Sequence, residues 1–306
     1  IVLKQKFKKG SFYCPFFLFI IKQHLMDNSK NKFLKNLEHK EDSIWGNVYD
    51  YGKQKQEKIL REEYANNKKY GDYLSEIKHH HSIPVMDSEV KKFLNLIPKN
   101  GVILDIGGCW GWHWRNLNNV RPDIKIIILD LIRENLLHAK KLLNELIDNQ
   151  QIFLIHGNAT DLKFEDKIFD GVWSVQTTQH IPNFFNVCKE IHRVLKPKGI
   201  YWDYSLNNAK FTRLIYRLFK KNYHLDGELK GFYFLRRVNK EIFSTLKDIF
   251  NQSFEIRYSE ILFSPELHLP IGGNHKSIFG FIDSKLTGNG IIRSLIARQC
   301  SFHIKK

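Results

Sequence analysis

The sequence has few cysteines, and their spacing excludes the covalent and metal-based frameworks that stabilise many small domains. Its 306 residues include only 4 cysteines. Cys14, Cys109, Cys188 and Cys300 lie far apart, and no two of them form a CxxC pair. Neither a disulfide framework nor a zinc knot is therefore indicated. We expect a protein of a reducing compartment, the cytoplasm.

Long hydrophobic runs are also absent, so no transmembrane segment is predicted. The apolar stretch Phe12–Ile21 follows a basic start and has about ten residues, too few to span a bilayer. No small-residue cleavage site follows it. The sequence opens on Ile1 and its first methionine is Met26. We expect residues 1–25 to be an upstream translation artefact, with a peripheral membrane anchor as the alternative, and we treat residues 1–40 as an N-terminal tail.

Acidic residues are scarce relative to basic ones. The 32 Asp and Glu residues face 48 Lys and Arg residues, which gives a formal net charge of +16 and a pI near 9.5. Such a balance favours nucleic acid, anionic lipid or a phosphorylated substrate as partner. The chain is also rich in Lys, Asn, Ile and Phe, the residues that AT-rich codons encode, and this bias would produce the same charge. Net charge alone therefore identifies no partner.

Residues 41–98 are expected to form an N-terminal helical cap. The polar stretch "KQKQEKILREEYANNKK" at 53–69 predicts a solvated helix rather than a core element. The run His79–His81 is interpreted as a polar loop before Pro84. A metal site is disfavoured because adjacent side chains point in different directions and no carboxylate has ligand spacing.

Strand-like and helix-like patterns alternate over residues 99–206. A helix, "DSEVKKFLNLIP", leads into this region; it is capped by Asp87 or Ser88 and ends before Pro98. Short apolar runs separated by helices with one apolar stripe imply a parallel, doubly wound α/β sheet. The expected strands are "GVILDIG", "IKIIILD", "QIFLIHG", "FDGVWSV" and "GIYWDYS", and the expected helices begin at Trp112, Arg133 and Phe184.

The remainder of the chain is expected to complete the same domain. Residues 238–306 predict a helix, "NKEIFSTLKDIF", and two closing strands, "FEIRYSEILF" and "KSIFGFID". These two strands bring the sheet to seven, with an antiparallel edge strand and added helices. The tail "GIIRSLIARQCSFHIKK" is interpreted as a basic surface helix.

Residues 207–237 interrupt the alternation with interleaved aromatic and basic side chains. Such a surface would suit an aromatic or sugar ring that carries a phosphate or carboxylate, and it would equally suit an amphipathic helix packed on the core. We expect a mobile cover over the substrate pocket. If this cover selects an anionic substrate, Arg236 and Arg237 are the residues expected to do so.

A glycine-rich turn follows the first core strand, in "VILDIGGCWGWHW". Gly107, Gly108 and Gly111 let the backbone bend tightly and approach a ligand. The next strand ends in Asp130, 25 positions after Asp105, where a carboxylate can accept both hydroxyls of a ribose. A plain turn and a helix-capping acid are the alternatives. A dinucleotide site is disfavoured, because "GGCWGW" lacks the GxGxxG spacing.

These segments, with "HGNATDLKF", "FDGVWSVQTTQHI" and "LKPKGIYWDYS", resemble the successive motifs of class I, UbiE/type 11-like methyltransferases, a Rossmann-like family that uses S-adenosylmethionine. The resemblance covers about residues 99–206. It departs from the family at Cys109, where a glycine is usual. It implies that Asp105, Gly107, Gly108 and Gly111 surround the methionine part of the cofactor, that Asp130 holds the ribose and that Asn158 and Ala159 contact adenine.

The segment "SVQTTQHIP" faces the transferred methyl group in that family. The resemblance therefore places Gln176 at the cofactor and His180 as general base, since its unperturbed pKa suits neutral pH. The alternative is that His180 only packs or hydrogen-bonds the loop. No metal site is expected.

The acceptor is not marked by any motif. There is no "NPPY"-like run and no cysteine placed to attack a pyrimidine, which argues against the best-marked nucleic-acid methyltransferases. We expect a small-molecule or glycan/lipid-precursor acceptor, with an anionic one left open. An RNA methyltransferase and a non-catalytic cofactor-binding scaffold are the alternatives.

Overall fold

The computed structural model describes residues 32–35, 37–38, 42–48, 50–67, 73–220, 227–229, 233–263 and 272–306. The predicted apolar run at 12–21 and the interpretation of residues 1–25 lie outside these residues. No helix within the described ranges is long and apolar enough to cross a bilayer.

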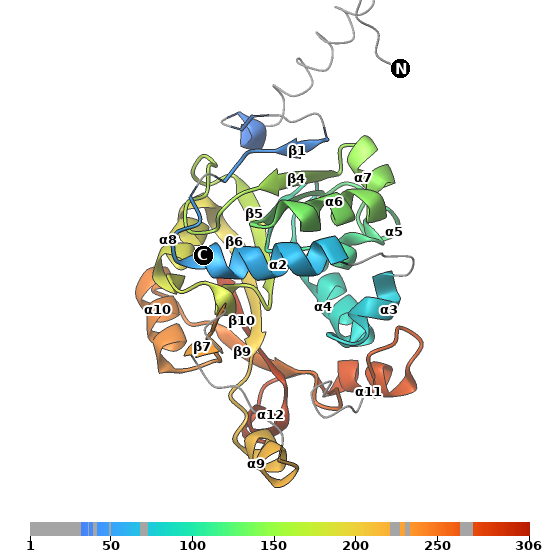
Figure 1. The fold of residues 1–306 in the computed structure, drawn as a ribbon, viewed down its shortest axis with the longest axis vertical. Helices are drawn as coiled ribbons and strands as arrows, with labels where there is room; N and C mark the ends of the chain where they lie inside the picture. Colours follow the sequence, from blue (N-terminus) through green and yellow to red (C-terminus); the bar gives the residue numbers. More distant parts are fainter. Residues whose placement is uncertain are drawn as a thin grey trace, which may run out of the picture.

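The chain folds around one eight-stranded sheet with the order β1-β4-β3-β2-β5-β6-β10-β9 (Figure 1). The first six strands of this order run parallel, and β10 is antiparallel to both of its neighbours, β6 and β9. The predicted doubly wound α/β fold is confirmed. The strands are β1 Ile44–Trp45, β2 Val102–Ile106, β3 Lys125–Asp130, β4 Ile152–His156, β5 Phe169–Val175, β6 Leu195–Leu206, β9 Glu255–Ser259 and β10 Gln299–Lys305.

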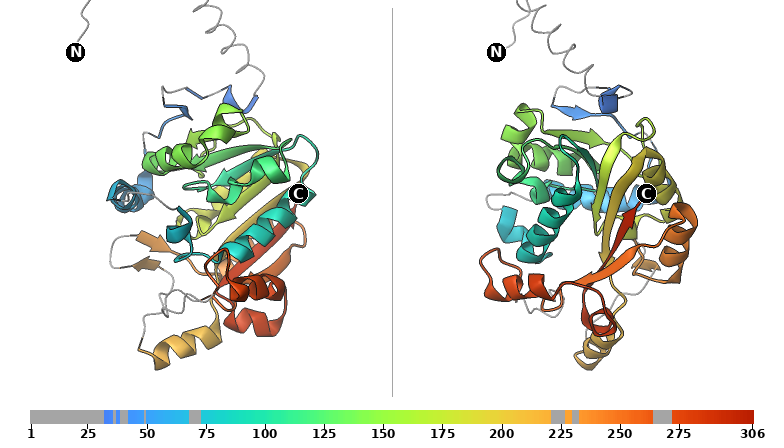
Figure 2. Two further views of the ribbon diagram at one scale, coloured as in Figure 1. Left: turned by 90° about the vertical axis from the view of Figure 1, so that its right-hand side faces the viewer. Right: turned by 180° about the vertical axis from the view of Figure 1, so that it is seen from behind.

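Helices cover both faces of the sheet (Figure 2). Successive residues of a strand point to opposite faces, so Ile126 and Ile128 join one core layer, whereas Ile127 and Leu129 join the other. The first layer is covered by α4 (Ile83–Leu96), α5 (Leu117–Val120), α6 (Arg133–Leu142) and α7 (Asn144–Asp148), and the second by α8 (Phe184–Val194) and α10 (Lys240–Phe250).

The eighth strand and several helix boundaries differ from the predictions. β1 comes from the expected cap and pairs in parallel with β4. α4 starts at Ile83 because Pro84 suits a first helical turn, not at Asp87 or Ser88. The helix expected from Trp112 is a 3-10 turn, η3 (Trp112–Trp114), followed by α5, and the one expected from Arg133 is divided at Leu143.

Two predictions for the C-terminal region were wrong. "KSIFGFID" forms a helix, α11 (Ile278–Leu286), capped by the Ser277 side chain, which accepts from Gly280 N. The tail forms α12 (Ile291–Ile296) and then β10 rather than one surface helix. In β10 apolar residues alternate with polar ones, and Cys300, Phe302 and Ile304 join the core. The basic residues on both sides of this short alternation led to the prediction of a surface helix.

The expected cover at 207–237 contains α9 (Lys210–Leu218) and a separate two-stranded sheet of β7 (Gly227–Leu229) and β8 (Tyr233–Leu235). Both lie outside the main sheet. Residues 221–226 and 230–232 of this prediction fall outside the described residues.

Replacing Phe302 by alanine tests whether the tail enters the sheet. Its ring is fully buried against Phe243 and Phe254, so Phe302→Ala should lower the free energy of unfolding by about 3–5 kcal/mol through the cavity it leaves. The control Phe281→Ala removes a ring that is 61% exposed and should cost less than about 1 kcal/mol. Equal, small losses in urea unfolding would contradict a buried C-terminal strand.

Candidate cofactor and acceptor site

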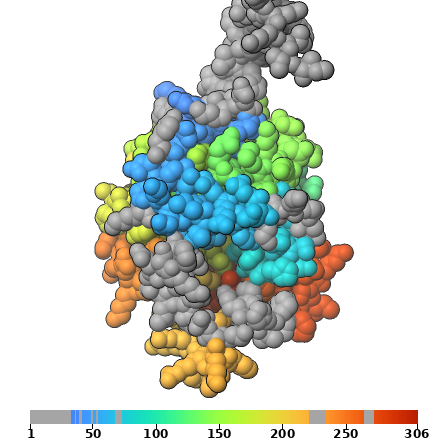
Figure 3. Space-filling view, in the orientation of Figure 1, coloured from blue at the N-terminus to red at the C-terminus, as the bar shows by residue number. Residues whose placement is uncertain are grey.

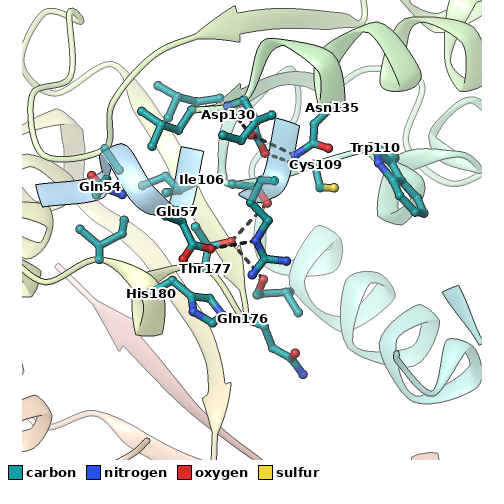
Figure 4. Close-up of a pocket in the computed structure, with 18 of the residues that line it drawn as sticks. Gln54, Glu57, Ile106, Cys109, Trp110, Asp130, Asn135, Gln176, Thr177 and His180 are labelled. Carbon is teal, nitrogen blue, oxygen red and sulfur yellow. Dashed lines mark hydrogen bonds and ion pairs between the residues drawn. The ribbon is translucent and has the colours of Figure 1, made fainter. Parts of the chain in front are cut away.

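A cavity of about 360 Å³ opens at the carboxyl ends of β2, β3, β4 and β5. In open α/β sheets this edge is where ligands bind. Six of the predicted site residues line it, namely Gly107, Asp130, Asn158, Ala159, Gln176 and His180. Figure 4 shows Asp130 and Cys109 on one side of the cavity and Gln176 and His180 on the other.

The turn after β2 requires glycine at position 107. Gly107 has φ +67°, and a Cβ there would lie 2.2 Å from the Thr177 side chain. Thr177 Oγ1 donates to Gly107 O at 3.2 Å, and Gly107 N donates to Leu129 O at 2.7 Å. These hydrogen bonds hold the turn against the ends of β3 and β5. Because Gly107 has no side chain, its backbone lines the cavity directly.

The carboxylate of Asp130 is fixed by backbone donors from two turns. Oδ2 accepts from Cys109 N at 2.9 Å, and Oδ1 accepts from Ile132 N at 2.8 Å and from Asn135 Nδ2 at 3.4 Å. Burial raises the pKa of Asp130 even though these hydrogen bonds oppose the shift. Among the described residues Oδ2 accepts one hydrogen bond, and a carboxylate oxygen can accept two, so Asp130 at the cavity wall can accept another from a ligand.

Three predicted residues lie behind the turn instead of lining the cavity. Asp105 is 1% exposed and accepts from Trp114 Nε1 at 2.7 Å; burial raises its pKa to about 7. A Cβ on Gly108 would lie 2.4 Å from Asp105 Oδ2, and one on Gly111 would meet the Leu143 side chain. These glycines give room for packing, and Asp105 supports the turn from beneath.

Asn158 forms a turn of its own at the end of β4. Its Oδ1 accepts from both Thr160 N at 3.0 Å and Thr160 Oγ1 at 2.9 Å. With this oxygen occupied, the side chain offers a ligand its amino group rather than its carbonyl. Ala159 lies beside it, 5% exposed, at the wall of the cavity.

The two polar residues after β5 differ in how they are held. Gln176 has φ +50°, and its Nε2 is buried without a hydrogen-bond partner in the described part of the chain. His180 Nδ1 donates to Phe234 O at 2.9 Å, which leaves Nε2 to accept from Gln179 Nε2 at 3.1 Å. Burial lowers the pKa of His180 to about 3, with a contribution from nearby Arg61. This arrangement favours the packing interpretation of His180.

The sequence analysis predicted the helix at 53–69 but not that this helix covers the cavity. α2 (Lys55–Asn67), predicted to be solvated, lies across this face of the molecule (Figure 3). Glu57 and Arg61 of α2 line the cavity and form an ion pair at 2.8 Å. Their i,i+4 spacing was the available signal, but surface helices share it.

The histidine run also contributes to the cavity. It follows α3 (Tyr73–Ile77) as a turn, and His80 and His81 line the cavity wall. Burial lowers the pKa of His81 well below its usual value, so it is neutral there. Within the described residues no group of His, Cys, Asp or Glu is placed to hold a metal ion.

Arg236 and Arg237 do not occupy the position expected of anion-selecting residues. They are 4% and 7% exposed. Arg236 Nη2 donates to Pro182 O at 2.9 Å, and Arg237 Nη1 donates to Asn207 O at 3.0 Å. Both guanidinium groups are engaged by backbone carbonyl oxygens. The expectation that they contact an anionic acceptor is therefore not supported by their position.

Comparison with known proteins finds a methyltransferase family over the part of the chain that carries this cavity. The model of the family described as "Methyltransferase domain" matches residues 104–202. Demethylmenaquinone methyltransferases of Bacillus mycoides (strain KBAB4) and Bacillus cereus (strain B4264) are 32% identical over 111 residues, which cover 36% of this chain and 46% of each relative. The chain thus spans about half the length of these curated relatives.

Two solved structures show the same fold. A SAM-dependent methyltransferase from Thermotoga maritima is 16% identical, covers 83% of this chain and 99% of its own, and has a TM-score of 0.54. The [4+2]-cyclase SpnF is 14% identical, covers 72% and 80%, and has a TM-score of 0.50. At these identities the likeness concerns the fold alone.

The methyltransferase family model matches residues 104–202 and the fold agrees with this match, which confirms the resemblance to S-adenosylmethionine-dependent methyltransferases drawn from the motifs. Within this class, the chain is similar to the demethylmenaquinone methyltransferases along 111 residues.

Replacing Gly107 by alanine should destabilise the protein by more than the cost of a left-handed backbone conformation alone. The left-handed conformation costs an L-residue about 1–2 kcal/mol, and the Cβ would also displace Thr177. Gly52→Ala is the matched control, because Gly52 has φ +48° with nothing within 4 Å of a Cβ. We expect Gly107→Ala to exceed the control by at least about 2 kcal/mol in urea unfolding. Equal losses would show that the contact with Thr177 relaxes.

The buried carboxyl of Asp105 makes stability depend on pH. Its folded-state pKa of about 7 lies above the usual 3.8, so the folded protein keeps a proton that the unfolded chain releases, and stability falls as pH rises from about 4 to about 7. Asp105→Asn removes this dependence while an amide oxygen can still accept from Trp114. Relative to the wild type, the variant should gain about 2–3 kcal/mol between pH 5 and pH 8. Parallel pH profiles of the two proteins would exclude Asp105 as the cause.

Proposed function

We propose that this chain is an S-adenosylmethionine-dependent methyltransferase that acts on a small-molecule or glycan/lipid-precursor acceptor. The observation that carries the proposal is the Asp130 carboxylate, held by two turns at the wall of a cavity of about 360 Å³ in a methyltransferase domain.

The cavity wall suits the parts of the cofactor. Asp130 would accept from the ribose hydroxyls, the backbone of the Gly107 turn would lie along the methionine part, and Asn158 and Ala159 would border the adenine. The bound cofactor supplies a methyl group on a cationic sulfur, and the carboxylate of Asp130 favours a cation in this region. Asp105 would act on the cofactor only through the turn that it supports.

The remaining wall supports a small acceptor. α2 encloses the cavity, and the described lining offers Gln176, whose buried amide nitrogen can donate to an acceptor oxygen, beside the Glu57–Arg61 pair. A covered cavity suits a small molecule better than an RNA helix, which a protein contacts over a wide basic surface. The curated relatives methylate demethylmenaquinone by name, which supports the same acceptor class.

In this proposal the enzyme accelerates methyl transfer by positioning the acceptor atom against the methyl group. Methyl transfer is an in-line displacement, so the enzyme must bring the acceptor atom within about 3–3.5 Å of the methyl carbon. His180 is neutral and both of its ring nitrogens are engaged. We therefore assign His180 to the positioning of the loop after β5 and give it no proton-transfer step.

Removing the carboxylate of Asp130 should weaken cofactor binding. Calorimetry should detect binding of S-adenosylmethionine or S-adenosylhomocysteine to the wild type, and Asp130→Ala should lose about 1.5–3 kcal/mol of binding free energy, as for hydrogen bonds to a charged group. The control Asp148→Ala removes an exposed carboxylate of α7 and should bind normally. No binding to the wild type at millimolar ligand would sink the proposal.

The acceptor class can be tested with labelled cofactor. Incubation of the protein with S-adenosylmethionine labelled in the methyl group and a cell extract should label a small product that mass spectrometry can identify. Turnover should change little from 50 to 200 mM salt, whereas RNA binding would weaken steeply through counterion release. Labelled RNA would overturn the acceptor assignment, and cofactor binding without any labelled product would favour the scaffold alternative.

A further inference from the structure

Three helices, α9, α11 and α12, lie at one end of the molecule (Figures 1 and 2), and they expose large apolar side chains to solvent. Most of the large apolar side chains that are exposed in the described residues lie on them or directly beside them. The most exposed are Ile291, Ile292, Ile278, Leu218, Phe219 and Phe281, at 81%, 75%, 74%, 72%, 68% and 61%. Single exposed apolar residues are normal, but a gathering of this kind marks an interaction surface.

Helix α11 has its polar face inside and its apolar face outside. Gly280, Asp283 and Ser284 are buried, and Asp283 accepts from Ile261 N at 2.9 Å and Leu262 N at 3.2 Å. Ile278 and Phe281 lie on the opposite, exposed face. This arrangement reverses that of an ordinary surface helix in water, so the outward face suits a nonaqueous neighbour.

Helix α9 carries two parallel stripes. Phe211, Leu214 and Leu218 recur at spacings of three and four residues and are 51%, 50% and 72% exposed. One position away, Lys210, Arg213 and Arg217 recur at the same spacing and are also exposed, and Lys220 follows just after the helix ends. An apolar stripe beside a basic stripe is the pattern of a helix that lies in a membrane interface. α12 packs beside α9, where Thr212 Oγ1 donates to Ile296 O at 2.9 Å.

The exposed charged side chains of these three helices are all positive. Across α9, α11 and α12 the acidic residue is Asp283, which is fully buried, and the other charged side chains are cationic. A second copy of this chain on the same surface would bring cation against cation. Nucleic acid would satisfy the cations and leave the isoleucines and phenylalanines in water. An anionic lipid surface satisfies both.

We propose that the exposed side chains of α9, α11 and α12, which we call the basic apolar face, dock this protein on the surface of an anionic lipid bilayer. α9 and α11 have 9 residues each and α12 has 6, so the helices lie in the interface and do not span it. Phenylalanine and isoleucine side chains enter the boundary between headgroups and acyl chains, while lysine and arginine pair with lipid phosphates. This proposal does not depend on methyl transfer.

Vesicle flotation of the full chain tests the proposal. The protein should float with vesicles of phosphatidylcholine mixed with phosphatidylglycerol and much less with phosphatidylcholine alone. Phe281→Ser/Lys285→Gln removes an exposed ring and the ammonium group 5.2 Å from its centre on α11, and should weaken the affinity by at least about tenfold. Arg213→Gln/Arg217→Gln should reduce the preference for anionic vesicles while leaving weak binding to neutral ones.

The chain offers a matched control on the other side of the sheet. Phe185 and Lys189 of α8 form the same i,i+4 pair, with the ammonium group 5.6 Å from the ring centre and the ring 49% exposed. Phe185→Ser/Lys189→Gln should leave flotation unchanged, and unfolding midpoints should show that all variants are folded. Absence of flotation with anionic vesicles, or equal loss in the α8 control, would overturn the proposal. A dimer that the α11 variant dissociates would assign the face to a second copy instead.

Discussion

The carboxylate of Asp130 holds together the two turns on which the whole site depends. One oxygen accepts from Cys109 in the turn after β2, and the other accepts from Ile132 in the turn after β3. Both turns would otherwise leave backbone N–H groups buried without partners, which is costly. Because parallel strands bring their carboxyl ends to one edge, a single side chain can join turns that lie more than twenty residues apart in sequence.

A second constraint at this edge is that position 107 has no room for a side chain. Thr177, after β5, occupies the space that a Cβ at position 107 would need. Asp105 and Trp114 fill the space beneath the turn and bond to each other. The cavity is therefore shaped by contacts behind its wall as much as by the residues that line it. α2 closes it from the front with the Glu57–Arg61 pair.

A separate polar cluster secures the end of the molecule where the basic apolar face lies. Buried Glu260 accepts from Ser82 N at 2.9 Å and from Arg298 Nη1 at 2.5 Å, so it joins the start of α4 to the segments around β9 and β10. Burial raises the pKa of Glu260 to about 7 even with Arg298 beside it. Asp283 of α11 accepts from Ile261 N and Leu262 N in the segment that follows Glu260, so buried hydrogen bonds hold the inner face of this helix while its outer face is apolar.

The sequence by itself determined the parallel core, because buried strands read as short apolar runs and their order follows the chain. It also identified the strand ends at Gly107, Asp130, Asn158 and Gln176, since ligand sites of such sheets follow from topology. Tertiary structure alone decided which of these residues line the cavity. Local patterns could not show that Asp105 lies behind the turn, that α2 covers the site, or that the basic tail ends as a strand between β6 and β9, because each depends on contacts between segments distant in sequence.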